Sequence, residues 1–405
     1  MFLSITGKTN KDSLSVTMKI FVILSRVPYP LDKGDKLRAF NQIKQLSKKH
    51  QIVLFALNDE PLDEFALIEL KKYCIAISIM KFSKVTIFFN LIRAFFNGNP
   101  FQVGYFHFKK AQKKIDTLLI KHKPDHIYCQ LIRTAEYAKS YPYIPKTLDY
   151  MDVFSKGVER RKLTVPFYMR PILALEHNRL LKYEHNIFRY FNNKTIISEQ
   201  DKNLIQHPQN QEIKVIPNGV DSDYFKSIPF EKEFEILFNG NMDYPPNIES
   251  AEYLVNKIMP LVWKKLPNTR LLISGASPNK KVLALKSEKV VISGWVHDIR
   301  ENFAKSKILV APMQISIGLQ NKLLEAMAMQ LPCVTSTLAN NALGAKHNEQ
   351  ILVANTPEEY VQCIFELLQD EAKARKISMN GYKFVINNFN WQSTTSALEA
   401  LFRKK

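Results

Sequence analysis

Residues 309–336 read LVAPMQISIGLQNKLLEAMAMQLPCVTS, and this stretch predicts a strand, a loop and a helix in direct succession. Its first residues, 309–311, are continuously apolar, as in a buried strand, and residues 321–330 have the apolar spacing of a helix. Gly318 lies in the polar loop between them, where the missing side chain allows a ligand to approach the backbone. The amides at the start of such a helix carry a partial positive charge, so we expect an anion site here, suited to a pyrophosphate.

The alternation of strand and helix continues on both sides of this segment. In the first half of the chain, strands are expected at 19–25 and 52–57, on either side of a helix at 35–50. The second half repeats the rhythm, with expected strands at 235–238, 270–274, 290–293, 308–311 and 333–336 and expected helices at 247–266, 299–306 and 321–330. Strands that alternate with helices form parallel sheets. The sequence therefore predicts an α/β fold with two doubly wound domains, whose ligands bind outside the carboxyl ends of the strands.

The domain boundaries follow from turn-forming residues. IPNGVDSDYF, residues 216–225, separates the two series of strands and helices, so we expect a hinge there. The expected order is a disordered extension at 1–17, a first domain at 18–215, the hinge at 216–225, a second domain at 226–388, and a C-terminal helix at 389–405 that packs back on the first domain.

Composition and cysteine usage exclude several classes of protein. The chain of 405 residues is 46% hydrophobic and 11% aromatic, as in a folded globular protein. Its four cysteines are scattered without a CxxC pair, which argues for reduced thiols and against a disulfide framework or a zinc site. No apolar run reaches the ~18–20 residues that span a membrane, and the first residues lack the pattern of a secretory signal. The histidines show no spacing that favours a metal site, so we expect no metal.

Positive charge is concentrated in the first half of the chain. The formal net charge is +19, and residues 71–194 carry 23 Lys and Arg against 8 Asp and Glu. Within that window, FSKVTIFFNLIRAFFNGNPFQVGYFHF, residues 82–108, contains nine aromatic residues. It suits a helix that lies in a membrane interface with lysines on anionic headgroups, so we expect the stretch 81–114 to face a membrane. The alternatives are a helix packed in the core or against a partner, and nucleic acid as the anion, for which no recognition motif is present.

Two charged side chains of the expected helix at 321–330 fit a nucleotide. Lys322 would add a full positive charge beside the expected pyrophosphate site. Glu325 lies one turn after Asn321 and on the same face, where its carboxylate could accept hydrogen bonds from two ribose hydroxyls. The alternative is that both are solvated charges on an ordinary helix surface. Geometry alone leaves these two interpretations open.

Two pairs of carboxylates are candidates in the first domain. Asp149 and Asp152, in LDYMDVFSKGVERRK, follow an apolar run, so a carboxylate at that strand end could orient an acceptor hydroxyl. The alternative is a helix cap or a loop ion pair. Glu176 and Glu184 lie in a basic helical stretch, where ion pairs such as Glu176–Arg179 account for them.

Residues 318–336, GLQNKLLEAMAMQLPCVTS, resemble the donor site of family 4 glycosyltransferases, whose two Rossmann-like domains face each other across a cleft in the GT-B fold. More narrowly, they are similar to sugar transferases associated with PEP-CTERM exosortase systems. RVPYPLDKGDKLRAFNQIKQLSKKH at 26–50, IPNGVDSDYF at 216–225 and FNGNMDYPPNIESA at 238–251 match that subfamily as well. The resemblance covers residues 18–400, in order and at the family's spacing.

The resemblance implies a donor site assembled from both domains. The positions implied to lie at the phosphates are Gly34 with Lys33, Lys36 and Arg38, then Gly240, Asn241, Gly318, Leu319, Gln320, Asn321 and Lys322. The positions implied to lie at the nucleoside are Gly275, Gly294, Trp295, Val296, Asp298 and Glu325. The implied catalytic residues are Lys322, Glu325 and Asp152.

Two positions depart from the family pattern. The broader family carries a glutamate eight positions before the one matched by Glu325, where this chain has Ile317, which cannot bond a sugar hydroxyl. The Arg and Lys that commonly follow the glycine of the second-domain loop are absent from NGNMDYPPN. Lys322 is therefore expected to carry more of the phosphate charge.

The resemblance implies a retaining glycosyltransferase. It would move a sugar from a nucleotide diphosphate sugar to a hydroxyl of a lipid-linked glycan in bacterial cell-surface polysaccharide synthesis, with no metal or other cofactor. The expected location is the cytoplasmic face of the cell membrane, where the protein would bind peripherally. The alternatives are a nucleotide-sugar epimerase or another enzyme of this fold, such as a phosphorylase, and a catalytically weakened membrane-binding relative.

Overall fold

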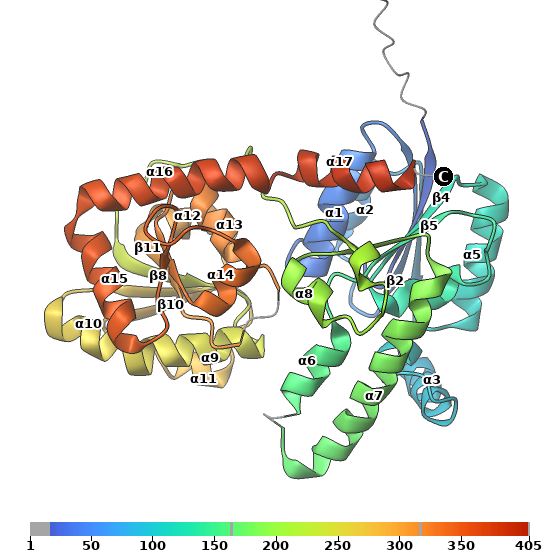
Figure 1. Ribbon diagram of the computed structural model, residues 1–405, viewed down its shortest axis with the longest axis horizontal. Helices are drawn as coiled ribbons and strands as arrows, with labels where there is room; N and C mark the ends of the chain where they lie inside the picture. Colours follow the sequence, from blue (N-terminus) through green and yellow to red (C-terminus); the bar gives the residue numbers. More distant parts are fainter. Residues whose placement is uncertain (1–16, 163–164, 316–317, 404–405) are drawn as a thin grey trace, which may run out of the picture.

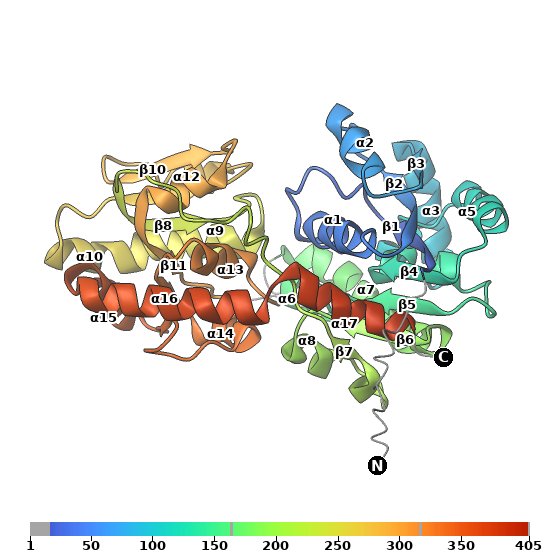
Figure 2. The ribbon, with the colours of Figure 1, turned by 90° about the horizontal axis from the view of Figure 1, so that it is seen from above.

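Two parallel sheets lie side by side, each covered by helices on both faces (Figure 1 and Figure 2). The structure, a computed structural model, describes residues 17–162, 165–315 and 318–403. All but the last residue of the expected extension at 1–17 lie outside the described residues.

The first sheet has seven parallel strands in the order β3-β2-β1-β4-β5-β6-β7. They are β1 (Lys19–Leu24), β2 (Gln51–Asn58), β3 (Ala76–Lys81), β4 (His126–Gln130), β5 (Lys146–Asp149), β6 (Asn193–Ile196) and β7 (Lys214–Val215). Strands β1 and β2 are apolar along most of their length because the sheet is buried on both faces. The strand order reverses between β1 and β4, and folds of this kind bind ligands at such a switch point.

The second sheet has six parallel strands in the order β10-β9-β8-β11-β12-β13. They are β8 (Phe234–Asn239), β9 (Leu271–Ser274), β10 (Val290–Gly294), β11 (Ser306–Ala311), β12 (Cys333–Thr335) and β13 (Leu352–Val353). Its switch point lies between β8 and β11. Each sheet therefore has one central position at which loops diverge to form a ligand site.

The helices fill the connections between strands. Those of the first domain are α1 (Gly34–Leu46), α2 (Glu64–Lys71), α3 (Lys84–Phe96), α4 (Phe101–Gly104), α5 (Lys109–His122), α6 (Phe154–Arg161), α7 (Arg170–Ile187) and α8 (Glu199–Leu204). Those that follow are α9 (Pro245–Tyr253), α10 (Met259–Lys265), α11 (Lys280–Leu283), α12 (Ile299–Ala304), α13 (Asn321–Ala328), α14 (Thr337–Leu343), α15 (Pro357–Gln369), α16 (Glu371–Asn388) and α17 (Trp391–Phe402).

One expected helix is interrupted in the structure. The stretch expected at 247–266 divides into α9 and α10, with a π-helical turn at Leu254–Ile258 between them. Pro260 follows this turn, and a proline inside a helix has no amide to donate and clashes with the preceding turn. The wider π-helical turn accommodates the missing hydrogen bond and the steric clash of the proline.

The C-terminal helix returns to the first domain. α17 lies on α1 (Figure 2), and its residues Leu398 and Phe402 belong to the hydrophobic cluster around β1. Asn193 Nδ2 donates to the carbonyl of Leu401 at 2.9 Å. The chain thus crosses between the two domains twice, once before β8 and once between α16 and α17.

The structure divides the aromatic stretch at 81–114 and corrects part of its interpretation. Phe106 and Phe108 are buried in the first domain's core, together with Val103, so these residues cannot face a membrane. In α3, by contrast, only Ala94 is buried, and the interpretation of this helix as a core helix is therefore wrong. No helix in the described part of the chain is long and apolar enough to cross a membrane.

Candidate active site between the two domains

A cavity of about 600 Å³ lies between the domains, at the carboxyl ends of both sheets. Loops after β1 and β4 line it from the first domain, and loops after β8 and β11 line it from the second. Residues that contribute to its wall include Arg26, Lys33, Gly34, Arg133, Asp152, Asn218, Asn241, Tyr244, Gly318, Leu319 and Asn321. The two switch points therefore open into the same cavity.

The start of α13 forms one side of the cavity. Gly318 adopts a φ of +66°, in the left-handed region that favours glycine, and it turns the chain from β11 into the helix. The N-cap residue Gln320 makes no side-chain cap hydrogen bond, so the helix start is not closed by its own cap. The Nδ2 of Asn218, in the hinge, donates to Asn321 Oδ1 at 3.0 Å and fixes the first residue of the helix. This arrangement suits a phosphate group.

The start of α1 forms the opposite side. Gly34 is the first residue of α1 and lines the cavity beside Lys33. A Cβ built on Gly34 would meet no atom within 4 Å, so the space beside this glycine is open. Two helix N-termini, one from each domain, thus border one cavity, and both favour negative charge there.

Two of the predicted phosphate ligands in α1 do not reach the cavity. Lys36 is buried and pairs with Asp32 at 3.0 Å and Glu60 at 3.4 Å. Arg38 is fully buried, and its Nε donates to Asp149 Oδ2 at 2.6 Å. The prediction that Arg38 lends charge to the phosphates, and the prediction that Asp149 could orient an acceptor, are both wrong because these two side chains neutralise each other beneath the cavity.

Lys322 also points away from the cavity. Its Nζ donates to Asn247 Oδ1 at 2.7 Å and lies 4.6 Å from the centre of the Phe238 ring. Desolvation lowers the pKa of this lysine to about 7. Asn247 Nδ2 in turn donates to the carbonyl of Asn241, which lines the cavity. Lys322 is therefore connected to the cavity wall only through Asn247 and the loop after β8.

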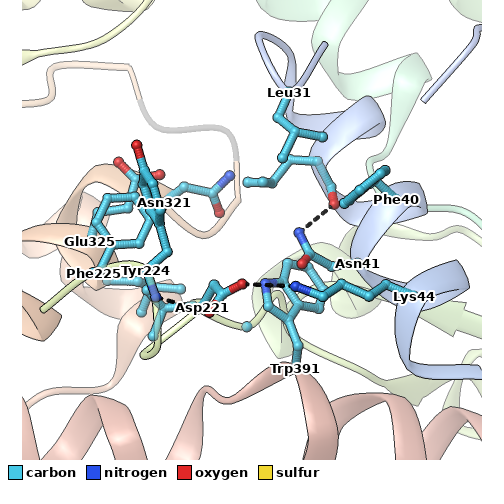
Figure 3. Close-up of a pocket in the computed structure, with 14 residues that line it drawn as sticks. Leu31, Phe40, Asn41, Lys44, Asp221, Tyr224, Phe225, Asn321, Glu325 and Trp391 are labelled. Carbon is cyan, nitrogen blue, oxygen red and sulfur yellow. Dashed lines mark hydrogen bonds and ion pairs between the residues drawn. The ribbon is translucent and has the colours of Figure 1, made fainter. Parts of the chain in front are cut away.

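Glu325 lines a second, smaller hollow. This hollow of about 210 Å³ lies between α1, the hinge, α13 and α17. In Figure 3, Glu325 and Tyr224 lie together on one side of the hollow, and Lys44 lies on the opposite side. Asn321 lines both the hollow and the cavity, so the predicted shared face of Asn321 and Glu325 is present. Burial raises the pKa of the Glu325 carboxyl to about 7.

The glycines of the second domain pack strand ends together. Gly275 has a φ of +140°, and a Cβ on it would lie 1.7 Å from the carbonyl oxygen of Gly240. The amide of Gly275 donates to the carbonyl of Gly294 at 3.1 Å, so the loops after β8, β9 and β10 are in contact. Gly240 and Gly275 support the cavity wall, whereas Asn241 is part of it.

The segment after β10 does not line the cavity. Trp295 is 68% exposed, and Val296 is half-buried next to it. Asp298 caps α12, pairs with Arg300 and accepts from the Tyr224 hydroxyl at 3.0 Å. The hydrogen bond from Arg300 and the other donors hold the pKa of the Asp298 carboxyl down to about 2. Its carboxylate is thus engaged within the protein.

Of the other carboxylates that the sequence singled out, one faces the cavity and two do not, and Asp32, Asp35 and Asp243 also line it. Asp152 lines the cavity, and burial together with the nearby Asp201 raises its pKa to about 6. Glu184 accepts from Ser155 Oγ at 2.6 Å, and Glu176 accepts from the amides of residues 101 and 102. The ion-pair explanation for Glu176 is wrong because the start of α4 takes up its carboxylate, while Arg179 donates to backbone carbonyls.

The sequence interpretation missed Arg133, Tyr244, Asn218 and Asn247. Asn218 lies within the expected hinge and Asn247 within the matched segment 238–251, but no local pattern shows that they bond Asn321 and Lys322 across space. Ile317, the position of the missing sugar-binding glutamate, lies outside the described residues. Within the described residues no three His, Cys, Asp or Glu side chains gather into a metal-binding group.

Comparison with known proteins finds a family match in the second domain and a relative that is similar along almost the whole chain. Residues 233–370 match the family described as Glycosyl transferases group 1. An uncharacterized 44.6 kDa protein in the cps region of Klebsiella pneumoniae is 23% identical over 402 residues, which cover 94% of this chain and 98% of that protein.

Solved structures of similar shape cover nearly the whole chain. Sucrose-phosphate synthase from Thermosynechococcus elongatus superimposes with a TM-score of 0.69 at 14% identity, over 95% of this chain and 98% of that chain. Anabaena HepE, in complex with UDP and glucose, superimposes with a TM-score of 0.68 at 15% identity, over 96% of this chain and 100% of that chain. The prediction of two Rossmann-like parallel-sheet domains in a GT-B arrangement is confirmed.

Proposed function

We propose that this chain, which is a glycosyltransferase by its matched second domain and its fold, transfers a sugar from a nucleotide diphosphate sugar to a hydroxyl group of a glycan acceptor. The observation that carries this proposal is the meeting of two helix N-termini at one cavity, Gly34 from α1 and Asn321 from α13. A diphosphate has two charged groups, and two positive helix ends facing one space can stabilise both.

The nucleotide end of the donor is assigned to the second domain. The solved Anabaena HepE complexes contain UDP, UDP-glucose, or UDP and glucose, which supports a nucleotide sugar as the donor here. Glu325, in the hollow beside Asn321, would accept hydrogen bonds from the ribose hydroxyls. The segment 294–298 lies outside the cavity but adjoins the hollow, because Tyr224 in its wall donates to Asp298, and this segment would contact the base.

The chemistry is that of electrostatic stabilisation. As the bond from the sugar to the β-phosphate breaks, negative charge grows on the diphosphate, and the amides at the start of α13 and of α1 stabilise it. Lys33 also lines the cavity, but its Nζ is paired with Glu60 at 2.5 Å. Asp152, ionised at neutral pH, would accept a hydrogen bond from the acceptor hydroxyl and orient it. In a retaining transfer the departing phosphate takes the proton of that hydroxyl, so no further protein base is required.

Lys322 takes a positioning role in this scheme. Its bond to Asn247 and the bond from Asn247 to the carbonyl of Asn241 hold the loop after β8 at the cavity. The two helix ends supply positive charge where other transferases use a divalent cation, so we propose that the reaction needs no metal. Activity that persists in EDTA supports this part of the proposal, and loss of activity that Mg²⁺ or Mn²⁺ restores contradicts it.

A position at an anionic membrane surface and a lipid-linked acceptor complete the proposal. Exposed aromatic residues of α3 are Phe88, Phe89, Phe95 and Phe96, and Lys84 and Arg93 lie on the same helix. The tip of the α6–α7 hairpin adds Phe167 and Tyr168, which are 79% and 66% exposed, and Figure 1 shows α3 and this hairpin projecting from the same side of the first domain. Apolar rings with cations beside them fit the interface of an anionic bilayer.

One relative supports the proposed biological setting. The Klebsiella pneumoniae relative is named from a cps region, which supports a role in cell-surface polysaccharide synthesis. The proposed relation to PEP-CTERM-associated sugar transferases rests on the sequence similarity of the segments 26–50, 216–225 and 238–251.

The test is an assay of donor turnover. The purified chain is incubated with a panel of nucleotide diphosphate sugars, with and without a membrane lipid extract, and release of nucleoside diphosphate and labelling of the lipid fraction are measured. We expect one donor to give lipid-dependent release and a labelled lipid product. Interconversion of the donor sugar without an acceptor would indicate an epimerase instead, and the absence of turnover with every donor would contradict the proposal.

A further inference from the structure

A side cavity of about 390 Å³ adjoins the candidate active site in the first domain. It lies between the loops that follow β1 and β2, and Arg26 and Asp32 line both the side cavity and the larger cavity of the active site. Its size is within the range of ~300–1,000 Å³ that is typical of small-molecule sites. All of its described lining residues belong to the first domain, so a ligand there would be held by that domain.

One hydrogen-bond donor in the side cavity has no partner. Asn58, the last residue of β2, lines the side cavity and is 6% exposed. Its Oδ1 accepts from the amide of Glu60 at 3.3 Å, whereas its Nδ2 is buried without a hydrogen-bond partner among the described residues. A buried donor is costly to leave unpaired, and nearly all such groups in folded proteins have a partner. An oxygen atom of a ligand in the side cavity would supply the acceptor that Asn58 lacks.

The charges around the side cavity balance one another. Lys36 is buried and pairs with Asp32 at 3.0 Å and with Glu60 at 3.4 Å, while Arg26 pairs with Asp35 at 3.0 Å. The charged residues that line the side cavity are two cations and three carboxylates, namely Arg26 and Lys36 with Asp32, Glu60 and Asp63. Because positive charge is not in excess, an anionic ligand is disfavoured. A metal ion is disfavoured as well, since Lys36 already neutralises two of the carboxylates.

The carboxylates remain open to hydroxyl groups. The side chains of Asp32 and Glu60 are 40% and 42% exposed, and an ionised carboxylate can accept several hydrogen bonds in addition to the one from Lys36. Tyr29 also lines the side cavity, and its ring packs against Phe40 with 6.0 Å between the ring centres. Acceptors and an unpaired donor beside an aromatic residue fit a neutral sugar, because sugar hydroxyls both donate and accept and the ring carbons pack on apolar surface.

We propose that the side cavity binds a neutral sugar of the glycan acceptor, next to the sugar that carries the reacting hydroxyl. This inference rests on the proposed glycosyl transfer and adds a binding site for the second sugar of the acceptor. The reacting hydroxyl meets Asp152 in the larger cavity, and the glycan passes Arg26 and Asp32 into the side cavity. There Asn58 Nδ2 donates to a sugar oxygen, and the carboxylates of Asp32 and Glu60 accept from sugar hydroxyls. The acceptor is therefore an oligosaccharide whose second sugar is uncharged.

Binding of glycans to the full chain tests this site separately from catalysis. The chain is applied to an array of neutral and acidic bacterial oligosaccharides of increasing length, and the best neutral ligand and its terminal monosaccharide are then titrated calorimetrically. We expect the oligosaccharide to bind about tenfold more tightly than the monosaccharide, or better, because only the longer ligand reaches both cavities. Equal affinity for the two, a preference for acidic oligosaccharides, or no binding to the array would overturn the proposal.

Two variants assign the gain in affinity to the side cavity. Asn58→Leu removes the unpaired donor and should weaken the oligosaccharide by about 3–10-fold, as the loss of one neutral hydrogen bond does. Glu60→Gln, at a partly exposed side chain, covers a failure of Asn58→Leu to fold and should weaken the oligosaccharide by about tenfold, because hydrogen bonds to an ionised acceptor are stronger. The matched controls are Asn268→Leu and Glu358→Gln at exposed positions, and both should bind as the wild type does. Wild-type affinity in Asn58→Leu and in Glu60→Gln would overturn the proposal.

Binding of nucleotide diphosphate sugars to the same proteins is measured in parallel. Its absence in the wild type would defeat the proposed transfer, while length-dependent binding of the oligosaccharide would still support the glycan site. Normal binding of a nucleotide diphosphate sugar together with equal affinity for the oligosaccharide and the monosaccharide would defeat the glycan site alone.

Discussion

Arg38 and Asp149 form an ion pair in which neither side chain is exposed, with 2.6 Å between Nε and Oδ2. The pair lies between α1 and β5, and it extends into the second domain. Arg38 Nη1 donates to Asn218 Oδ1 at 2.9 Å, and Asn218 donates to Asn321 at the start of α13. The buried pair thus anchors the hinge and, through it, the helix that faces the candidate donor site.

Removal of one partner of this pair should destabilise the protein strongly. Arg38→Leu leaves the Asp149 carboxylate buried with only Tyr128 and Thr195 as donors, and an uncompensated buried charge costs about 3–5 kcal/mol. Urea denaturation of the variant and the wild type measures the difference. Lys226→Leu, which breaks the exposed pair with Asp223, is the control and should change the free energy of unfolding by less than about 1 kcal/mol. Equal losses of unfolding free energy in the two variants would mean that burial does not make the Arg38–Asp149 pair more important than an exposed pair.

Gly34→Ala should reduce activity without reducing stability. A methyl group on Gly34 meets no protein atom, but it projects at the start of α1, where the donor phosphates are proposed to bind. We expect kcat/KM for the donor to fall by about 10²-fold or more, since a displacement of this size disturbs the reacting geometry. Gly157→Ala in α6, which is equally open, is the matched control. Unchanged turnover in Gly34→Ala would mean that the donor phosphates do not bind at the start of α1.

The sequence predicted the fold and the main candidate loops because those depend on local pattern. Apolar runs, turn residues and glycine positions located the two sheets and the connections that contain Gly34, Asn241 and Gly318, all of which line one cavity. Side-chain direction depends on packing, and there the prediction failed. Arg38 and Lys322 are basic residues at the expected places, but both turn inward and bond Asp149 and Asn247.

The dependence of contacts on tertiary packing also explains which features the sequence did not reveal. Arg133 follows β4, over a hundred residues from Arg26, and only the strand order β1-β4 makes them neighbours. The aromatic stretch at 81–114 reads as one unit in the sequence. The structure divides it because α3 lies outside the core while Phe106 and Phe108 lie within it. Which aromatic residue is buried depends on where the helix docks, and that is a tertiary property.

Donor affinity should depend on pH through Glu325. Burial raises the pKa of this carboxyl to about 7, so it is largely protonated at pH 6 and largely ionised at pH 8. Only the ionised form accepts two ribose hydrogen bonds, and donor affinity should therefore rise as the pH increases through 7. Titration of the matching nucleoside diphosphate at pH 6, 7 and 8 measures this. In Glu325→Gln the affinity should be lower at pH 8 by about 1.5–3 kcal/mol, and it should rise less between pH 6 and pH 8 than in the wild type.

Lys322 should make stability depend on pH above neutrality. Its pKa is lowered from 10.5 to about 7 in the folded chain, so between these values the unfolded chain holds a proton that the folded chain has released. The free energy of unfolding contributed by this residue therefore rises with pH over that window, and the cost of burying the charge is fully present below pH 7. Lys322→Met should have a higher free energy of unfolding than the wild type. Between pH 7 and pH 10.5 this difference should be largest at pH 7 and smallest at pH 10.5. Urea denaturation at several pH values, with exposed Lys257→Met as the control, measures the difference, and a constant difference would contradict the shifted pKa.

Binding to anionic vesicles should depend on the exposed face of α3. Phe89 and Phe96 are 63% and 79% exposed, and burial of each ring in an interface is worth up to about 1.5–3 kcal/mol. We expect the wild type to float with vesicles that contain phosphatidylglycerol, to float less at high salt, and to lose most of this binding when both residues are changed to Glu. Tyr143→Glu, which changes an aromatic residue that is 95% exposed and lies outside α3, is the control and should bind as the wild type does. Flotation that is equal with neutral vesicles, or that survives both substitutions in α3, would mean that this helix does not hold the protein at a membrane.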